Sequence, residues 1–199
     1  MSNDNDDTTI LAWHWLAKDR RLRFGDHALV TPGRTLTVEP PIALCERGLH
    51  ASVKALDSIK YAPGPIVCRV RVGGQIIHDD DKLVATERTV LWMADATQTL
   101  HEFACWCAER ALRAATVEDK RCWQAIEAKR AWLRGAINDE QLAAAWTAAE
   151  AAAWAAARTA AEAAARTAAW AAAWAAAWAA QNAHLEAVLL ALHAPEVTP

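Results

Sequence analysis

The chain lacks a strong excess of charge of either sign. Its 21 Lys and Arg residues nearly balance 24 Asp and Glu residues, which gives a formal net charge of -3 at pH 7. Proteins that bind nucleic acid usually carry a large basic excess, so we expect no nucleic-acid partner. The first residues, MSNDNDDTT, also lack the positive start and apolar run of a secretory signal. We therefore expect a disordered lead over residues 1–9 and a cytoplasmic protein.

The cysteines do not have the even number or regular spacing of a disulfide framework. There are five, at Cys45, Cys68, Cys105, Cys107 and Cys122. This usage predicts free thiols in a reducing compartment. Cys105 and Cys107 fall two apart on an expected helix, where their side chains point about 200° from each other. The sequence therefore predicts no metal site.

Glycine and proline are scarce, and their distribution divides the chain. Six of the seven glycines lie within residues 10–96, and neither residue type occurs between 136 and 194. The front part alternates apolar and polar residues as half-buried strands do, at 10–17, 66–78 and 82–94. These patterns predict an α+β fold, with a mostly antiparallel sheet domain over residues 10–96.

Turn and cap signals add detail to this front domain. Gly73-Gly74 predicts the turn of a hairpin inside residues 66–78. Ser52 is a candidate N-cap for a two-turn helix that ends before Pro63-Gly64. The run HDDDK at 78–82 predicts another turn.

From residue 97 onward the pattern is helical. Capping signals predict a two-helix segment over 97–135, and Asn138 with Gln141 three residues later opens a last segment. An uninterrupted Ala/Trp-rich helix over 136–194 would contain about 55 residues and extend roughly 80 Å. The sheet domain is thus followed by an all-α region with a long helix.

In the last expected helix, large side chains recur at intervals of four residues, with mostly alanine between them. They include Trp146, Trp154, Trp170, Trp174 and Trp178. Three bare tryptophans expose about 600 Å² of mainly apolar surface, more than a soluble monomer usually leaves in water. We expect a homo-oligomer formed through residues 138–194. The alternative is that the tail folds back on Trp106, Trp123 and Trp132 of its own chain. Alanine contributes little transfer free energy, so we expect no membrane span.

Four front fragments point to chemistry: LAWHW (11–15), GLHAS (48–52), ALDSIKYAPGPIVCRVRVGG (55–74) and TERTVLW (86–92). Together, residues 11–92 resemble the catalytic core of the ADP-ribosyltransferases, in particular the poly-ADP-ribose polymerase branch. The resemblance implies NAD as the cofactor. It places His14 on the histidine that hydrogen-bonds the nicotinamide ribose, Tyr61 on the aromatic that stacks on nicotinamide, and Glu87 on the glutamate that polarises the ribose.

Two positions depart from that family. His50 stands where the family has its first tyrosine, and Trp15 stands where it has a glycine that lets the nicotinamide amide reach the backbone. An indole at that position could fill the pocket. Both remain candidate ligand-binding residues, and both favour binding over turnover.

The whole chain also resembles uncharacterised phage and prophage proteins that join a similar front domain to an alanine- and tryptophan-rich tail. Two hypotheses follow. One is an ADP-ribosyltransferase-like domain that binds NAD or an ADP-ribose-type nucleotide and can transfer ADP-ribose. The other is a non-enzymatic interaction protein, an anti-defence inhibitor or nucleotide-signal binder with a host protein as its target.

Overall fold

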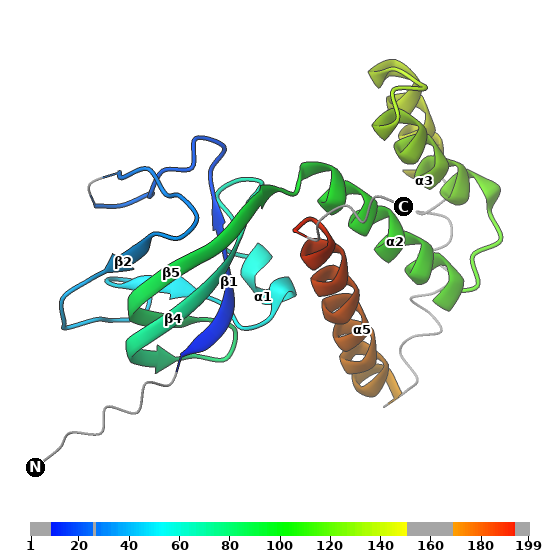
Figure 1. Cartoon of the computed structure of the whole chain (residues 1–199). Coiled ribbons are helices and arrows are strands. Elements are labelled where there is room, and N and C mark those ends of the chain that lie inside the picture. The colour runs from blue at the N-terminus through cyan, green and yellow to red at the C-terminus, as the bar shows by residue number, and fades with distance from the viewer. Residues whose placement is uncertain (1–8, 26, 151–168, 194–199) are drawn as a thin grey trace, which may run out of the picture. The chain divides into compact units, whose positions relative to one another are not determined.

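The computed structural model describes residues 9–25, 27–150 and 169–193 (Figure 1). Two compact units divide the chain: one runs to Thr97 and includes the chain from Ala180 onward, and the other covers Gln98–Ala179. The first unit holds the sheet, and the second is helical where it is described. The expected α+β class is therefore confirmed.

Five strands form the sheet of the first unit, and every strand pair is antiparallel, as expected. The strands are β1 (Ile10–Leu16), β2 (Thr35–Thr37), β3 (Leu49–Ala51), β4 (Ile66–His78) and β5 (Leu83–Asp95). The order is β1-β4-β5-β2, and β3 also pairs with β5. Alternating β-branched residues explain the two long central strands, which are buried along much of their length.

The predicted hairpin turn at Gly73-Gly74 is wrong, because residues 66–78 form one strand. The ladder shifts register between Gly73 and Ile76, and the turn comes after β4, where the Asp79 N–H donates to the Lys82 carbonyl. A Cβ at Gly74 (φ 69°) would lie 2.1 Å from Thr86 Oγ1. The glycines thus permit a β-bulge rather than a turn.

β1 and β3 meet at a seam that brings the sheet round on itself. The Trp13 and Ser52 backbones exchange two hydrogen bonds, of 2.8 and 3.0 Å. Ser52 is therefore used in this bridge, and the helix N-cap is Lys54 instead of the predicted Ser52. The main core cluster lies on the inner side and includes Cys68, Val70, Val72 and Val90, all with 0% exposure.

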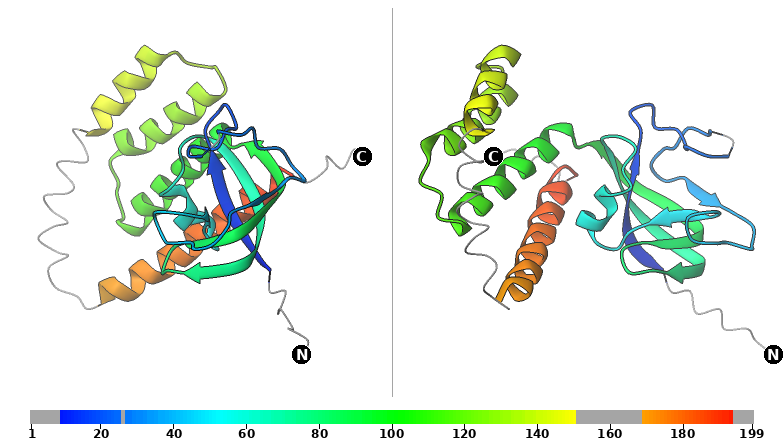
Figure 2. Two further views of the ribbon diagram at one scale, coloured as in Figure 1. Left: turned by 90° about the vertical axis from the view of Figure 1, so that its left-hand side faces the viewer. Right: turned by 180° about the vertical axis from the view of Figure 1, so that it is seen from behind.

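Two helices cover the outer side of the sheet: α1 (Ala55–Ile59) and the C-terminal part of α5 (Ala169–Ala191). Figures 1 and 2 show both on the same side of the sheet. Leu185 and Leu189 of α5 are fully buried. Burial of each leucine side chain contributes about 1.5–3 kcal/mol to the free energy of folding. The part of α5 from Ala180 onward therefore belongs to the sheet unit.

The second unit contains α2 (Thr97–Ala114), α3 (Lys120–Leu133) and a helical run at 139–150. Arg130 of α3 pairs with Glu102 and Glu109 of α2. The expected start of the last segment at Asn138 is confirmed: the Asn138 and Gln141 side chains each accept a hydrogen bond from the other residue's backbone N–H. The Arg130 pairs thus link α3 to α2 within the unit.

Much of the Trp/Ala register lies outside the described residues, including Trp154, and the Trp170 and Trp174 side chains are not described. Trp146 is 60% exposed. Whether the helix continues from 150 to 169, and whether the chain self-associates, stay predictions. None of the helices in the described ranges is both long and apolar enough to cross a membrane.

Candidate functional site

Arg88 of β5 is a buried cation on the inner side of the sheet. It is 3% exposed, and its register partners are Val72 and Leu36, both core residues. Its Nη1 donates to His14 Nδ1 (3.1 Å) and to the His50 carbonyl (2.7 Å), which links β1 to β3 across the seam. Burial lowers the Arg88 pKa to about 10.

The Arg88 charge is not neutralised by a carboxylate within the described parts of the chain. No Asp or Glu there forms an ion pair with it, and its Nε has no hydrogen-bond partner among them. Taking a cation out of water without a counter-charge is costly. An anion that reached the guanidinium would offset that cost.

Both seam histidines are held in the neutral form. Burial, followed by the Arg88 charge, lowers the His14 pKa well below its usual value. Burial is also the main cause of the lowered His50 pKa, with further contributions from the charges of Arg88 and Lys82. Neutral imidazoles can donate and accept hydrogen bonds without adding charge.

From His50 the contacts continue to the surface. The His50 Nε2 accepts a hydrogen bond of 2.9 Å from the Cys45 backbone N–H. Lys82 bonds to the Cys45 side chain and to the Tyr61 hydroxyl, and these bonds raise the Lys82 pKa. Its ammonium lies 4.9 Å from the Tyr61 ring centroid.

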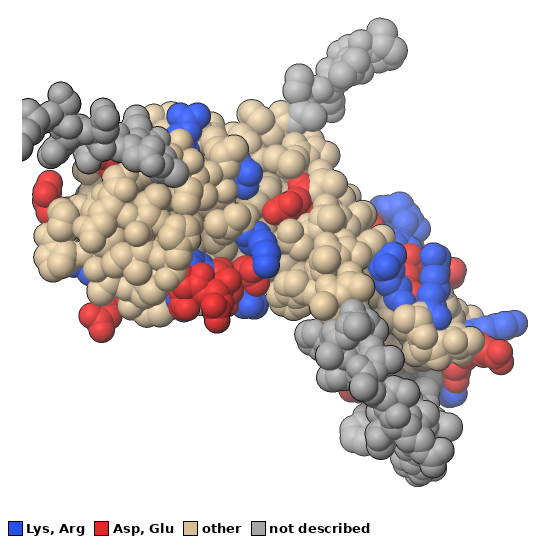
Figure 3. Space-filling view, turned by 90° about the horizontal axis from the view of Figure 1, so that it is seen from below, with Lys and Arg blue, Asp and Glu red and all other residues tan. Residues whose placement is uncertain are grey.

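Tyr61 is the exposed end of this arrangement. It is 48% exposed, and its hydroxyl donates to Asp81, which also pairs with Lys60. Figure 3 shows acidic and basic side chains in small mixed groups on one face of the molecule, between larger uncharged areas. We call the following residues the seam site: His14, Cys45, His50, Tyr61, Lys82 and Arg88.

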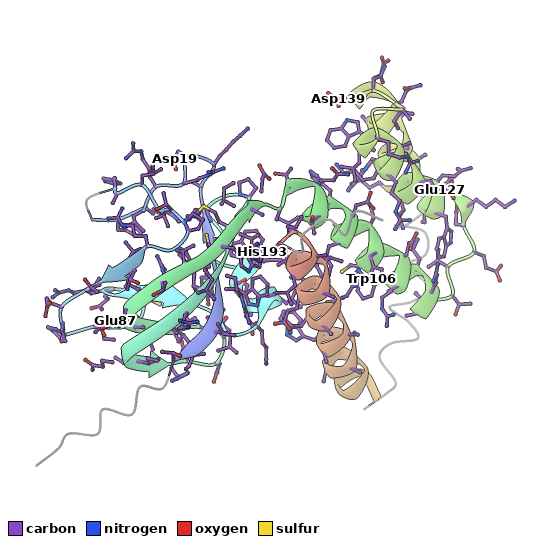
Figure 4. The ribbon with its side chains drawn as sticks, in the orientation of Figure 1. Asp19, Glu87, Trp106, Glu127, Asp139 and His193 are labelled. Carbon is purple, nitrogen blue, oxygen red and sulfur yellow. The ribbon has the colours of Figure 1, made fainter. Side chains whose placement is uncertain are left out.

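Three of the five expected site residues thus belong to one set of contacts, and Glu87 does not. Glu87 pairs with Gly73, one step along the ladder from the Arg88–Val72 pair, so it points to the opposite face from Arg88. It is exposed on β5 (Figure 4). The structure does not bring Glu87 together with His14.

The Trp15 side chain is buried inside the protein. It is 2% exposed, and its Nε1–H donates to Ser58 Oγ at 2.8 Å. The indole packs beneath α1 on the outer side of the sheet, so it presents no free surface to a ligand.

Sequence reasoning missed Arg88, Lys82 and Cys45. One signal could have revealed Arg88: it precedes the buried Val90 by two residues, which places an arginine on the apolar face of a strand. No local pattern identifies Lys82 or Cys45, since their proximity depends on the fold.

No group of three or more His, Cys, Asp or Glu side chains among the described residues is arranged to hold a metal ion. All five cysteines are free thiols, and burial raises the Cys68 pKa to about 12.

Comparison with known proteins identifies one region. Residues 19–102 match a domain of unknown function, DUF7666. The matched region contains every residue of the seam site except His14, which lies before it. No curated protein and no solved structure matches the chain.

The neutral histidines predict a pH dependence of stability. Because the His14 and His50 pKa values are lowered on folding, the unfolded chain binds more protons below about pH 6.5. The free energy of unfolding should therefore fall as pH drops from 7 towards 5, by up to about 1.4 kcal/mol per pH unit for each histidine. Urea unfolding of His14→Gln should show a shallower decline. An equal decline in both proteins would contradict this assignment.

Proposed function

We propose that the sheet unit binds an anionic nucleotide of the ADP-ribose type, NAD included, at the seam site. The observation that carries the proposal is the buried Arg88 guanidinium, which has no carboxylate partner among the described residues. Phosphate oxygens are strong acceptors for such a donor. The resemblance to ADP-ribosyltransferases supports the same ligand class.

The remaining seam residues suit the rest of a nucleotide. Lys82 adds a second cation, which contacts the Tyr61 hydroxyl and Cys45 and pairs with Asp79 at 3.8 Å. The half-exposed Tyr61 ring offers an aromatic surface for a base. Glu87, the carboxylate expected to assist cleavage of the glycosidic bond, faces the other side of the sheet. We therefore propose a binding protein rather than a transferase, located in the cytoplasm.

Calorimetry of the full-length chain with ADP-ribose, NAD and adenosine tests the proposal. ADP-ribose and NAD should bind, whereas adenosine, which lacks phosphate, should not. Arg88→Met keeps an apolar stem of similar length and removes the charge-assisted donors. It should weaken ADP-ribose binding about 10- to 150-fold, since such bonds contribute about 1.5–3 kcal/mol.

Arg71→Met is the matched control, because Arg71 lies on the same sheet and is exposed. It removes the same charge and should leave the affinity unchanged. Tyr61→Ala should cost about 1–3 kcal/mol of binding if a base stacks there, while Glu87→Gln should bind normally. Equal affinities of wild type and Arg88→Met would refute the seam site.

The second candidate is a non-enzymatic interaction protein that assembles through its helical tail and targets a host protein. The exposed Trp146 favours this candidate, because a 60% exposed indole offers a contact surface. The two candidates are separated by the same calorimetry: binding of neither NAD nor ADP-ribose would leave the interaction protein as the better hypothesis.

A further inference from the structure

The C-terminal part of α5 makes specific contacts with the sheet unit. The Asn182 side chain accepts a hydrogen bond of 3.0 Å from the Leu56 N–H, and Glu186 accepts one of 3.4 Å from the Ala55 N–H. These amides begin α1, whose N-cap side chain makes no capping bond. Two side chains of α5 thus replace the missing cap of α1.

Glu186 of α5 and His193, just after its end, lie near a row of two tryptophans and an arginine on the outer side of the sheet. Trp13, Arg69 and Trp92 are register neighbours on β1, β4 and β5. His193, which is labelled in Figure 4, stacks on Trp92 with ring centroids 5.2 Å apart and an interplanar angle of 10°. The Glu186 charge also acts on Arg69. Residues 182–193 therefore dock by matched polar, aromatic and apolar contacts.

The docked arrangement leaves two buried donors unused. Trp13 Nε1 and Arg69 Nη1 have no hydrogen-bond partner among the described residues, and Trp13 is 1% exposed. A buried donor without an acceptor opposes burial. The burial of these two donors therefore carries a cost that the apolar contacts around them must offset.

α1 connects this docking surface to the seam site. Asp57 of α1 pairs with Lys60, Lys60 pairs with Asp81, and Asp81 accepts the hydrogen bond of Tyr61. Ser58 of α1 accepts the Trp15 indole N–H. The position of α1 thus sets the Tyr61 and Lys82 end of the seam site.

We propose that residues 182–193 act as a latch that controls the seam site through α1: docking orders the Tyr61–Asp81–Lys82 end, and undocking loosens it. The functional consequence rests on the proposed nucleotide binding. By linkage, a ligand that needs the ordered end also favours docking of α5.

Hydrogen exchange of the full-length chain tests the latch without any ligand. The double variant Asn182→Ala/Glu186→Ala removes the two capping acceptors and keeps helix propensity. We expect faster exchange in residues 54–62 and also in residues 79–83, which the substitutions do not touch. Leu190→Ala is the control, because Leu190 is on the same helix and 47% exposed. It should leave both segments unchanged.

A calorimetric arm measures the consequence for binding. The double variant should bind ADP-ribose at least fivefold more weakly than wild type, the lower end of common coupling strengths. ADP-ribose should in turn slow exchange in residues 182–193 of wild type. Failure of wild type to bind nucleotide would refute the proposed function alone, since the exchange arm still decides the latch. Unchanged exchange at 79–83 in the double variant would overturn the latch.

Discussion

Gly48→Ala should lower the free energy of unfolding of the sheet unit by about 2–6 kcal/mol. Gly48 has φ of 129°, and a Cβ there would lie 2.3 Å from Val84 Cγ2 and 3.2 Å from Ile42 Cγ2. Val84 is 0% exposed and Ile42 6%, so neither can move aside. The estimate adds about 1–3 kcal/mol of backbone strain to about 1–3 kcal/mol of overpacking. Urea unfolding measures the loss.

Gly25→Ala separates the two causes. Gly25 also has a positive φ, of 82°, but no atom lies within 4 Å of the position of its Cβ. It should cost only the backbone strain, about 1 kcal/mol. If both variants lost the same stability, the close contact of Gly48 with Val84 would not explain the effect.

Replacing Leu185 and Leu189 together by Ala should release α5 from the sheet. Both side chains are fully buried, and truncation of a buried leucine costs about 2–5 kcal/mol. We expect the double replacement to lower the free energy of docking by at least about 4 kcal/mol. The loss cannot exceed the total free energy with which the helix docks. Hydrogen exchange in residues 180–193 should rise to that of an undocked helix.

The exposed leucines of the same region provide the control. Leu190 and Leu192 are 47% and 38% exposed, so their double replacement by Ala removes equal carbon with little loss of buried area. It should cost less than about 1 kcal/mol and leave α5 docked. A large loss in this control would show that helix stability, rather than docking, determines the outcome.

Local signals predicted the elements that depend on local chemistry. The alternation of 10–17 and 82–94 predicted β1 and β5 to within one residue at every end. The start of the last segment at Asn138 was also predicted, because the hydrogen bonds that cap it join residues only three apart. Gly73-Gly74 misled because glycine with positive φ serves both turns and bulges, and only the pairing with β5 distinguishes them.

The candidate site was predicted in part. His14, His50 and Tyr61 came from a resemblance, and the structure joins them in one set of contacts. Glu87 came from the same resemblance, yet the β4–β5 register turns it to the other face. A shift of one residue along a strand moves a side chain to the other face of the sheet. A short motif therefore cannot predict which face a residue occupies unless the register of the strand is known.

By itself, the sequence determined the α+β class, the free cysteines and the change from strand to helix at residue 97, because composition and periodicity are local properties. Only the tertiary structure decided that the buried Arg88 side chain joins β1 to β3, and that the end of the last helix returns to cap α1. Asn182 and Leu56 are 126 residues apart in the chain. Contacts over such distances depend on how complete elements pack, which no local pattern records.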